Sequence, residues 1–351
     1  MSNITSTQIQ LINRPNGWPT HDDFRVESVE YGELEPGQVR VRNEFVSVDP
    51  YMRGRMNDTR SYVAPFALGE TITGGAVGRV VESASDSLHI GTAVLHQHGW
   101  SDVIQADAET FRPAPDIEGA PLSVHLHILG MTGLTAYVGL TAIAGLKEGD
   151  TVFVSGAAGA VGTAAGQIAK LLGAGRVIGS AGSAEKVALL TEKYGYDEAF
   201  NYKEVNVREQ LAVVAPEGVD VYFDNVGGDH LEAALDVMND GGRIALCGAI
   251  AGYNSTDRTP GPDNMANIIT RGLKLEGFTL ANYLHLAPEF REKMTPWFAE
   301  GQIAYDETVV DGIENTVDAF LDMMRGANAG KMLVRVIYVP MISAEHRRCK
   351  V

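Results

Sequence analysis

The chain has 351 residues, of which 45% are hydrophobic and 21% charged, and its formal net charge is −17. This length allows two domains, and so acidic a surface disfavours nucleic acid or an anionic membrane as a partner. No apolar run reaches the roughly 18 residues of a membrane span, and the start, MSNITSTQIQLINRP, lacks the basic and apolar regions of a signal peptide. We therefore expect a cytoplasmic protein that binds neither nucleic acid nor membrane.

The cysteines and histidines do not indicate a metal centre. The two cysteines, Cys247 and Cys349, are too few for a disulfide framework or a zinc cluster. Two pairs of histidines have i, i+2 spacing, which suits strands or loops better than a metal site on a helix: His96 and His98, and His125 and His127. We expect structural or surface roles for these histidines, with metal binding as a minor alternative, and no metal cofactor.

The sequence pattern divides the chain into three successive regions of different predicted secondary structure. Residues from about 25 to 112 contain short strands between turns, which predicts an irregular, barrel-like β domain. A helical region follows, SVHLHILGMTGLTAYVGLTAIAG, and from Asp150 buried apolar strands alternate with helices. That alternation predicts a parallel sheet covered on both faces. Its six expected strands lie in DTVFVSG, RVIGSAG, EAFNY, VDVYFDNVGG, GRIALCGAI and LKLEGFTL.

Beyond Gly301 the sequence pattern changes again. The segment AGKMLVRVIYV is predicted to be a last strand that returns to the first domain. The expected organisation is a substrate domain at 1–127, completed by 303–351, and a nucleotide-binding domain at 128–302. The fold class is α/β, with a doubly wound Rossmann sheet and a separate β-barrel domain.

The first strand-to-helix turn of the expected sheet is VSGAAGAVGTAAGQIAK, from Val154 to Lys170. Gly156, Gly159 and Gly162 form a relaxed version of the G-x-G-x-x-G fingerprint, in which small residues let the backbone approach a pyrophosphate at a helix N-terminus. The alternative is a helix packed closely on a sheet without a ligand. The order strand, loop, helix and the five further strands favour the dinucleotide site, and Gly162 and Gly166 are expected to hold the helix against the sheet.

The end of the second strand indicates which nicotinamide cofactor binds. An NAD site places a carboxylate there for the ribose diol, whereas this chain has Ser180, Ala181, Gly182 and Ser183. Lys186 is the candidate cation for an adenosine 2′-phosphate, and Tyr202 can add a hydroxyl from the next strand. An ordinary solvated lysine is the alternative for Lys186. The missing acid favours NADP.

The absence of any cysteine before Cys247 also bears on the reaction. Zinc alcohol dehydrogenases of similar architecture use Cys and His ligands in the first domain. Alcohol oxidation is catalysed poorly without a Lewis acid. Reduction of an activated C=C bond needs less help, because the conjugated carbonyl accepts the developing charge.

Several segments resemble the zinc-independent prostaglandin reductase branch of the medium-chain dehydrogenases/reductases, which includes alkenal double-bond reductases and curcumin reductases. The similarity runs from about residue 8 to residue 337. The segments are VDPYMRGRM (Val48–Met56), GLTAYVGL (Gly133–Leu140), GAAGAVGTAAGQIAK, AGSAEKV, AFNYK, DVYFDNVGG, GRIALCGAI with the following YN, and GANAGK (Gly326–Lys331).

The resemblance implies a GroES-like barrel beside the Rossmann domain, a homodimer formed through the Rossmann sheets, and NADPH-dependent reduction of the C=C bond of α,β-unsaturated ketones and aldehydes. Hydride would reach the β-carbon without help from a metal. The cofactor-binding positions that it implies are Ala158, Gly159, Ala160, Val161, Gly162, Ser183, Lys186, Tyr202, Asn225, Cys247, Gly248, Ala249, Ile250, Tyr253, Phe278, Thr279, Leu280 and Asn328.

Tyr253 is the expected donor to the enolate oxygen, with a purely packing role as the alternative, and Tyr51 is a second donor or a pocket wall. Cys247 is expected to be a small apolar neighbour of the cofactor rather than a nucleophile. The competing functions are an NADPH quinone oxidoreductase and a non-catalytic NADPH-binding protein. The loop Gly252–Asn264 is expected to shape the substrate pocket, and the tail after Val336 has no role that the resemblance implies.

Overall fold

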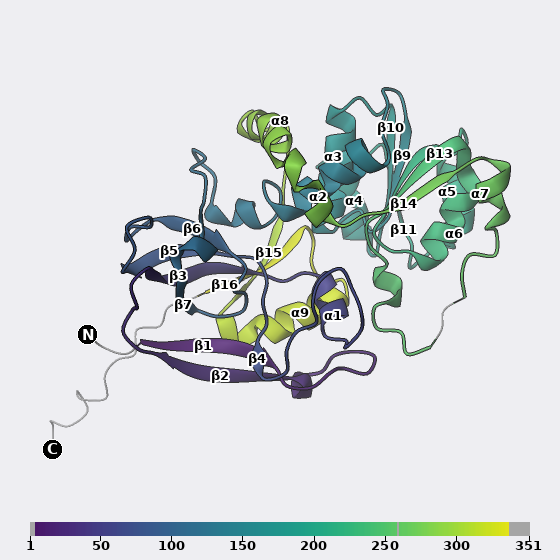
Figure 1. Cartoon of the computed structure of the whole chain (residues 1–351). Coiled ribbons are helices and arrows are strands. Elements are labelled where there is room, and N and C mark those ends of the chain that lie inside the picture. Colours follow the sequence, from purple (N-terminus) through teal and green to yellow (C-terminus); the bar gives the residue numbers. More distant parts are fainter. Residues whose placement is uncertain (1–3, 258–259, 337–351) are drawn as a thin grey trace, which may run out of the picture.

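A computed structural model describes residues 4–257 and 260–336 (Figure 1). Within that part of the chain the strands form one parallel sheet of six and two further sheets of seven and three strands. Cys349 and the tail after Val336 lie outside the described residues, as do Arg258 and Thr259 of the loop expected to shape the pocket.

The parallel sheet has the order β11-β10-β9-β12-β13-β14, which is the doubly wound arrangement. The six strands that the sequence predicts are therefore confirmed. They are β9 (Thr151–Val154), β10 (Arg176–Ala181), β11 (Glu198–Asn201), β12 (Val219–Asp224), β13 (Met238–Leu246) and β14 (Lys274–Gly277).

Alternate residues of these strands supply two cores, one on each face of the sheet. Val152 and Val154 of β9 belong to a cluster with the buried residues of helices that follow Gly130 and Gly159. Phe153, between them in sequence, points the other way and stacks on Phe200 and Tyr222. This period of two, with both faces apolar, is why the strands read as unbroken hydrophobic runs.

Nine α-helices lie in the described residues, and those that follow the sheet strands cover its two faces (Figure 1). They are α1 (Tyr51–Arg55), α2 (Met131–Val138), α3 (Ala160–Leu171), α4 (Ala184–Glu192), α5 (Val207–Val214), α6 (Gly228–Val237), α7 (Ala266–Thr270), α8 (Ala287–Ala299) and α9 (Thr316–Met324). Short 3-10 helices are η1 (His21–Asp23), η2 (Ala108–Thr110), η3 (Leu122–Leu126), η5 (Ile250–Gly252), η6 (Leu280–Leu286) and η7 (Ile313–Asn315), and η4 (Gly139–Ile143) is a π-helix.

The remaining strands build the barrel-like region that the sequence predicts. One sheet has the order β15-β16-β3-β5-β6-β8, with β7 pairing with β3, and the other has the order β2-β1-β4. The strands are β1 (Ile4–Leu11), β2 (Phe24–Tyr31), β3 (Gln38–Ser47), β4 (Glu70–Thr71), β5 (Ala76–Ser83), β6 (Ala93–His96), β7 (Val103–Asp107), β8 (Arg112–Pro113), β15 (Glu307–Asp311) and β16 (Lys331–Arg335).

The chain returns to the barrel region after the parallel sheet, as the sequence predicts. β16 pairs antiparallel with β3, with Leu333 opposite Ser47. Just before β16, Gly330 donates its amide to Ala158 O at 2.8 Å, so the returning segment also touches the glycine loop. The exact domain boundaries at residues 127 and 302 stay a prediction. No helix in the described residues is long and apolar enough to cross a membrane.

Candidate active site

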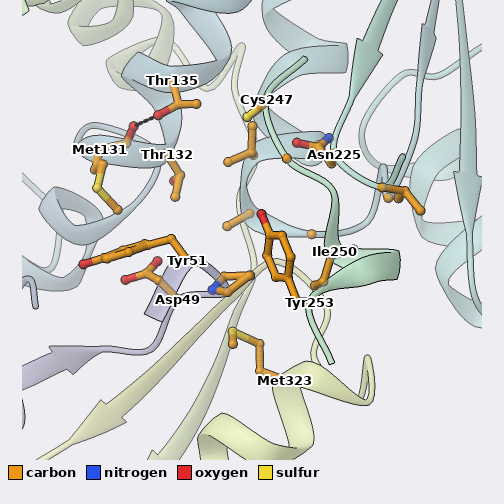
Figure 2. A pocket seen from close by; sticks show the side chains of 18 of the residues that line it. Asp49, Tyr51, Met131, Thr132, Thr135, Asn225, Cys247, Ile250, Tyr253 and Met323 are labelled. Carbon is orange, nitrogen blue, oxygen red and sulfur yellow. Dashed lines mark hydrogen bonds between the residues drawn. The ribbon is translucent and has the colours of Figure 1, made fainter. Parts of the chain in front are cut away.

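A cavity of about 1880 Å³ opens between the carboxyl ends of the parallel strands and the barrel region. Ligands of open α/β sheets bind at this edge of the sheet. All residues expected to bind the cofactor line the cavity except Ser183, and so do both tyrosines expected to act in catalysis. Figure 2 shows that side chains from the two regions face one another across it.

The glycine loop brings the backbone to the cavity wall, and at Gly162 no larger residue fits. A Cβ placed on Gly162 would lie 2.5 Å from Gly156 O and 2.6 Å from Ala157 Cα. Gly156 itself has φ +58°, a left-handed conformation that favours glycine. Gly159 caps α3, and the first amide bonded within that helix is that of Thr163, to Gly159 O at 2.9 Å. The amides at positions 160–162 therefore precede the first helical hydrogen bond.

Gly166 serves a different neighbour from the one expected. A Cβ on Gly166 would lie 2.2 Å from the ring of Tyr196, and the Tyr196 hydroxyl donates to Gly162 O at 2.7 Å. The glycine therefore makes room for an aromatic ring from the segment before β11, rather than only for a strand of the sheet. Sequence periodicity cannot reveal this contact, because Tyr196 lies in a loop.

Lys186 and Tyr202 lie together at the end of the cavity that the second and third strands form. The Tyr202 hydroxyl lies 3.1 Å from the point where Gly182 would carry a Cβ, and Lys203 Cε lies 3.2 Å from it. Lys186 Nζ donates to Gly326 O at 2.7 Å, and burial, followed by the charge of Lys203, lowers the pKa of Lys186. Two ammonium groups and a phenol thus gather beside a strand end that carries no carboxylate.

Ser183 has a local structural contact. Its hydroxyl accepts the amide of Lys186 at 3.3 Å and so caps the N-terminus of α4. It does not line the cavity.

The segment Asp224–Gly227 forms the floor beneath the glycine loop. The buried carboxylate of Asp224 accepts from Ser155 Oγ at 3.0 Å and from the amides of Val226 and Gly227 at 2.9 and 2.8 Å. Asn225 then donates its side-chain amide to Ser155 O at 2.8 Å. Sequence reasoning selected Asn225 but missed Asp224, which fixes the turn; an acid at the end of an apolar strand was the available signal.

Tyr253 lies above the end of β13. Its hydroxyl oxygen accepts the amide of Ala249 at 3.4 Å, and a Cβ on Gly248 would lie 3.4 Å from it. Burial raises the pKa of Tyr253, so the phenol stays neutral at physiological pH. Burial also raises the pKa of Cys247 to about 12, which keeps the thiol protonated and disfavours a nucleophilic role.

Tyr51 belongs to α1 on the opposite wall, where the phenol points away from that of Tyr253 in the view of Figure 2. Burial, followed by the charge of Asp49, raises the pKa of Tyr51. Asp49 accepts from Ser47 Oγ and pairs with Lys331 Nζ at 3.0 Å. Lys331 is only 2% exposed and also donates to Val48 O at 2.6 Å, so the turn before Tyr51 is tied to β16.

Several residues at the barrel wall of the cavity were not predictable from the sequence. Trp18 and Tyr62 are 50% and 67% exposed and lie in loops without a periodic pattern. Arg53 lies in a recognised segment, but its role depends on partners distant in sequence, which are described below.

Each of the paired histidines lies within hydrogen-bond distance of another protein group, and the roles expected for them stay predictions. His96 Nε2 lies 2.7 Å from Asn43 Oδ1, and burial, followed by His98, lowers its pKa to about 3. His125 Nε2 lies 2.9 Å from Pro115 O. His127 Nε2 lies 2.9 Å from Glu307 Oε1. Among residues 4–257 and 260–336, no group of three or more His, Cys, Asp or Glu side chains is arranged to hold a metal ion.

The charge of the cavity is opposite to that of the whole chain. Seven Lys and Arg side chains line it against two carboxylates, although the net charge of the chain is −17. The cations are Arg55, Arg112, Lys186, Lys203, Arg291, Arg325 and Lys331, and the carboxylates are Asp49 and Asp229. A cleft lined mainly by one sign of charge concentrates ligands of the other sign, so this one favours an anionic ligand.

Two family models match the chain. Residues 7–113 match the model described as the N-terminal domain of oxidoreductase, and residues 160–300 match the model described as zinc-binding dehydrogenase. The solved structure of CurA from Vibrio vulnificus in complex with NADPH has a TM-score of 0.90 and 40% sequence identity. That comparison covers 95% of this chain and 100% of the other.

Curated relatives are similar over nearly their full lengths. The NADPH-dependent curcumin reductase of Escherichia coli is 40% identical over 93% of this chain and 95% of its own length. The NADP(+)-dependent 2-alkenal reductase of Nicotiana tabacum is 41% identical over 95% of this chain and 98% of its own length. The chain therefore belongs to the medium-chain dehydrogenase/reductase family, in the branch of curcumin, 2-alkenal and prostaglandin reductases.

Proposed function

We propose that the chain is an NADPH-dependent reductase of the C=C bond in α,β-unsaturated ketones and aldehydes. The observation that carries the proposal is a cavity that joins a glycine loop and a cationic corner to two half-buried tyrosines, Tyr51 and Tyr253, on opposite walls. Relatives whose names specify NADPH-dependent curcumin reduction and NADP(+)-dependent 2-alkenal reduction support the same assignment.

The residues present fit a dinucleotide phosphate. The cradle at Gly156–Gly162 has no space for a Cβ at Gly162, so the backbone itself forms the wall that would face the pyrophosphate. Lys186, Lys203 and Tyr202 would hold the adenosine 2′-phosphate, which needs positive charge and donors. The remaining lining positions Asn225, Phe278–Leu280 and Asn328 would surround the rest of the cofactor.

When bound, NADPH supplies the hydride that the β-carbon of the substrate accepts. Negative charge then develops on the conjugated carbonyl oxygen, where a fixed donor lowers the barrier most effectively. Tyr253 suits this role because its oxygen already accepts from Ala249 N–H, which leaves the phenolic proton available for donation. Its raised pKa keeps that proton in place. The phenol or water would protonate the α-carbon.

The other wall selects the substrate. Tyr51, Tyr62, Trp18 and Met131 present aromatic and apolar surface to the cavity. Such surface favours extended, conjugated substrates, with few polar groups to fix their orientation.

The direct test is steady-state turnover with NADPH and NADH in parallel, using 2-alkenals, curcumin-like dienones and quinones. We expect saturated carbonyl products from the first two classes, with NADPH preferred. Turnover of quinones alone would replace the proposal with a quinone oxidoreductase. Tight NADPH binding without turnover of any substrate would indicate a non-catalytic binding protein.

We also propose that the chain forms a homodimer through its parallel sheet. β14 is the end strand of that sheet, and Ile269, which is 85% exposed, lies in the helix preceding it. An unpaired sheet edge favours pairing with a second copy. Light scattering after gel filtration should give twice the monomer mass of 37.7 kDa; a monomer would refute the dimer. The cytoplasmic location stays a prediction from the sequence.

A further inference from the structure

Arg53 is a buried arginine whose hydrogen-bond partners in the described part of the chain are all neutral oxygens, although the charge of Asp23 also acts on it. It is 2% exposed and lies in α1, two residues after Tyr51. Nε donates to Asn254 Oδ1 at 2.8 Å, and Nη1 donates to Asn57 Oδ1 at 2.8 Å. Nη2 donates to Gly17 O at 2.7 Å and to Pro15 O at 3.4 Å. A charged group buried among neutral acceptors is costly to retain, so its geometry calls for an explanation.

The partners of Arg53 lie on three separate segments. Asn57 follows α1 itself, Gly17 precedes Trp18, and Asn254 follows Tyr253. Trp18 and Tyr253 both line the cavity. Gly17 has φ +80°, and a Cβ on it would lie 3.3 Å from Thr256 Cγ2, so the two loops also touch each other directly. The planar fork of one guanidinium thus joins both loops to α1.

The loop that carries Tyr253 is fixed at its base by the parallel sheet and at its tip by the barrel region. Ile250 and Ala251 donate their amides to Asn225 O at 3.3 Å and Val226 O at 3.1 Å. Ile250 and Tyr253 pack against the cluster that contains Met52 and Met323. The bond from Arg53 to Asn254 adds a directed polar contact to this apolar packing, one residue from the phenol.

We propose that Arg53 is a positioning residue, which holds the Tyr253 and Trp18 loops against α1 and so sets the place of the Tyr253 hydroxyl. The effect on catalysis rests on the proposed reductase function, whereas the effect on the loops does not. Displacement of a catalytic group by about 1 Å can cost up to about 100-fold in rate.

The chain offers a matched pair of variants. Asn254→Ala and Asn57→Ala each remove one side-chain oxygen that accepts from the same guanidinium, but only Asn254 belongs to the Tyr253 loop. Hydrogen–deuterium exchange is the readout that needs no activity. We expect amides at 249–257 to exchange about 10-fold faster in Asn254→Ala and less than about 2-fold faster in Asn57→Ala. Arg53→Met should accelerate exchange of the amides at both 13–18 and 249–257. Arg53→Lys should restore little of their protection, because an ammonium group lacks the planar, forked set of donors of a guanidinium.

Kinetics then test whether Arg53 acts through Tyr253. With an enone, Asn254→Ala should lower kcat about 10-fold while the NADPH dissociation constant changes less than about 2-fold. In a Tyr253→Phe background the same substitution should lower kcat no further, since coupled residues are not additive. Equal fold-losses in both backgrounds would overturn the positioning role.

The two proposals fail in different ways. Unchanged exchange at 249–257 in both Arg53→Met and Asn254→Ala would overturn the positioning role, even in an active reductase. Faster exchange in these variants, together with a wild-type protein that reduces no enone, would retain the role of Arg53 in holding the loops and refute the reductase. Asn254→Ala removes a half-buried group, so it tests the role even if Arg53→Met does not fold.

Discussion

The two walls of the cavity are built from different materials. On the parallel-sheet side the glycine loop forms the wall with backbone and very small side chains, and Ala157 and Ala158 are buried. On the barrel side Tyr51, Trp18 and Tyr62 reach the cavity from a short helix and loops. The glycine-loop wall depends on the shape of the backbone, whereas the barrel wall depends on separate segments being held in fixed positions relative to one another. We therefore expect substitutions to affect cofactor affinity on one side and turnover on the other.

The largest expected effect is at Tyr253, which lies above the end of β13, opposite the wall of Tyr51. Tyr253→Phe removes the phenolic donor and keeps the ring, so kcat with a saturating enone should fall about 100-fold or more. The NADPH dissociation constant, measured by fluorescence titration, should change less than about 3-fold. Full turnover by this variant would show that the ring only packs against its neighbours.

The backbone wall is tested by Gly162→Ala. The added Cβ would meet Gly156 O and Ala157 Cα at 2.5–2.6 Å, so the loop must shift. Overpacking of this kind costs about 1–3 kcal/mol, equivalent to about 5- to 150-fold in NADPH affinity if the cradle is displaced. Gly32→Ala is the matched control, because nothing lies within 4 Å of its Cβ. Equal NADPH affinities for the two variants would contradict a close-fitting cradle.

On the glycine-loop side of the cavity, Lys186→Ala tests the contribution of positive charge to cofactor binding, apart from the shape of the backbone. Loss of one ammonium at the cationic corner should weaken NADPH binding about 10-fold and leave NADH binding nearly unchanged, because only NADPH carries the 2′-phosphate. Lys147→Ala removes a lysine that lies outside the cavity and serves as the control. Equal losses for both cofactors would remove the 2′-phosphate role from Lys186.

The smallest expected effect is that of pH. A raised pKa means that Tyr253 keeps its proton above the ordinary tyrosine value, so its ionisation should not reduce turnover between pH 7 and pH 10. Cys247, with a pKa of about 12, also stays neutral in this range. We expect kcat to vary less than about 3-fold once NADPH is saturating at each pH. A fall with an apparent pKa below 9 that is absent in Tyr253→Phe would contradict a half-buried phenol that stays neutral.

The glycine-loop side of the cavity was predictable because the sequence patterns that indicate it are local. The apolar strands, the spacing of Gly156, Gly159 and Gly162, and the missing acid after β10 each lie within one strand–loop–helix unit. The predicted parallel sheet is confirmed, and so is the family that the motifs resemble. The roles assigned to single cofactor-binding and catalytic residues stay predictions, although all of these residues except Ser183 line the cavity.

The barrel wall was less predictable because its contacts join distant segments. Arg53 and Asn254 are 201 residues apart, and Trp18 reaches the cavity through a loop that Arg53 holds. The periodicity of hydrophobic residues in a sequence does not indicate contacts between segments so far apart. Similarly, Gly166 suggested close packing, but only the structure shows that the packing partner is Tyr196.

Transfer of deuterium from NADPH that carries deuterium at both C4 positions tests the central claim most directly. An α,β-unsaturated ketone is reduced with the labelled cofactor, and the product is examined by NMR. The proposed function predicts a saturated ketone with deuterium on the β-carbon. Deuterium on the carbonyl carbon of an allylic alcohol, or no transfer despite NADPH binding, would contradict it.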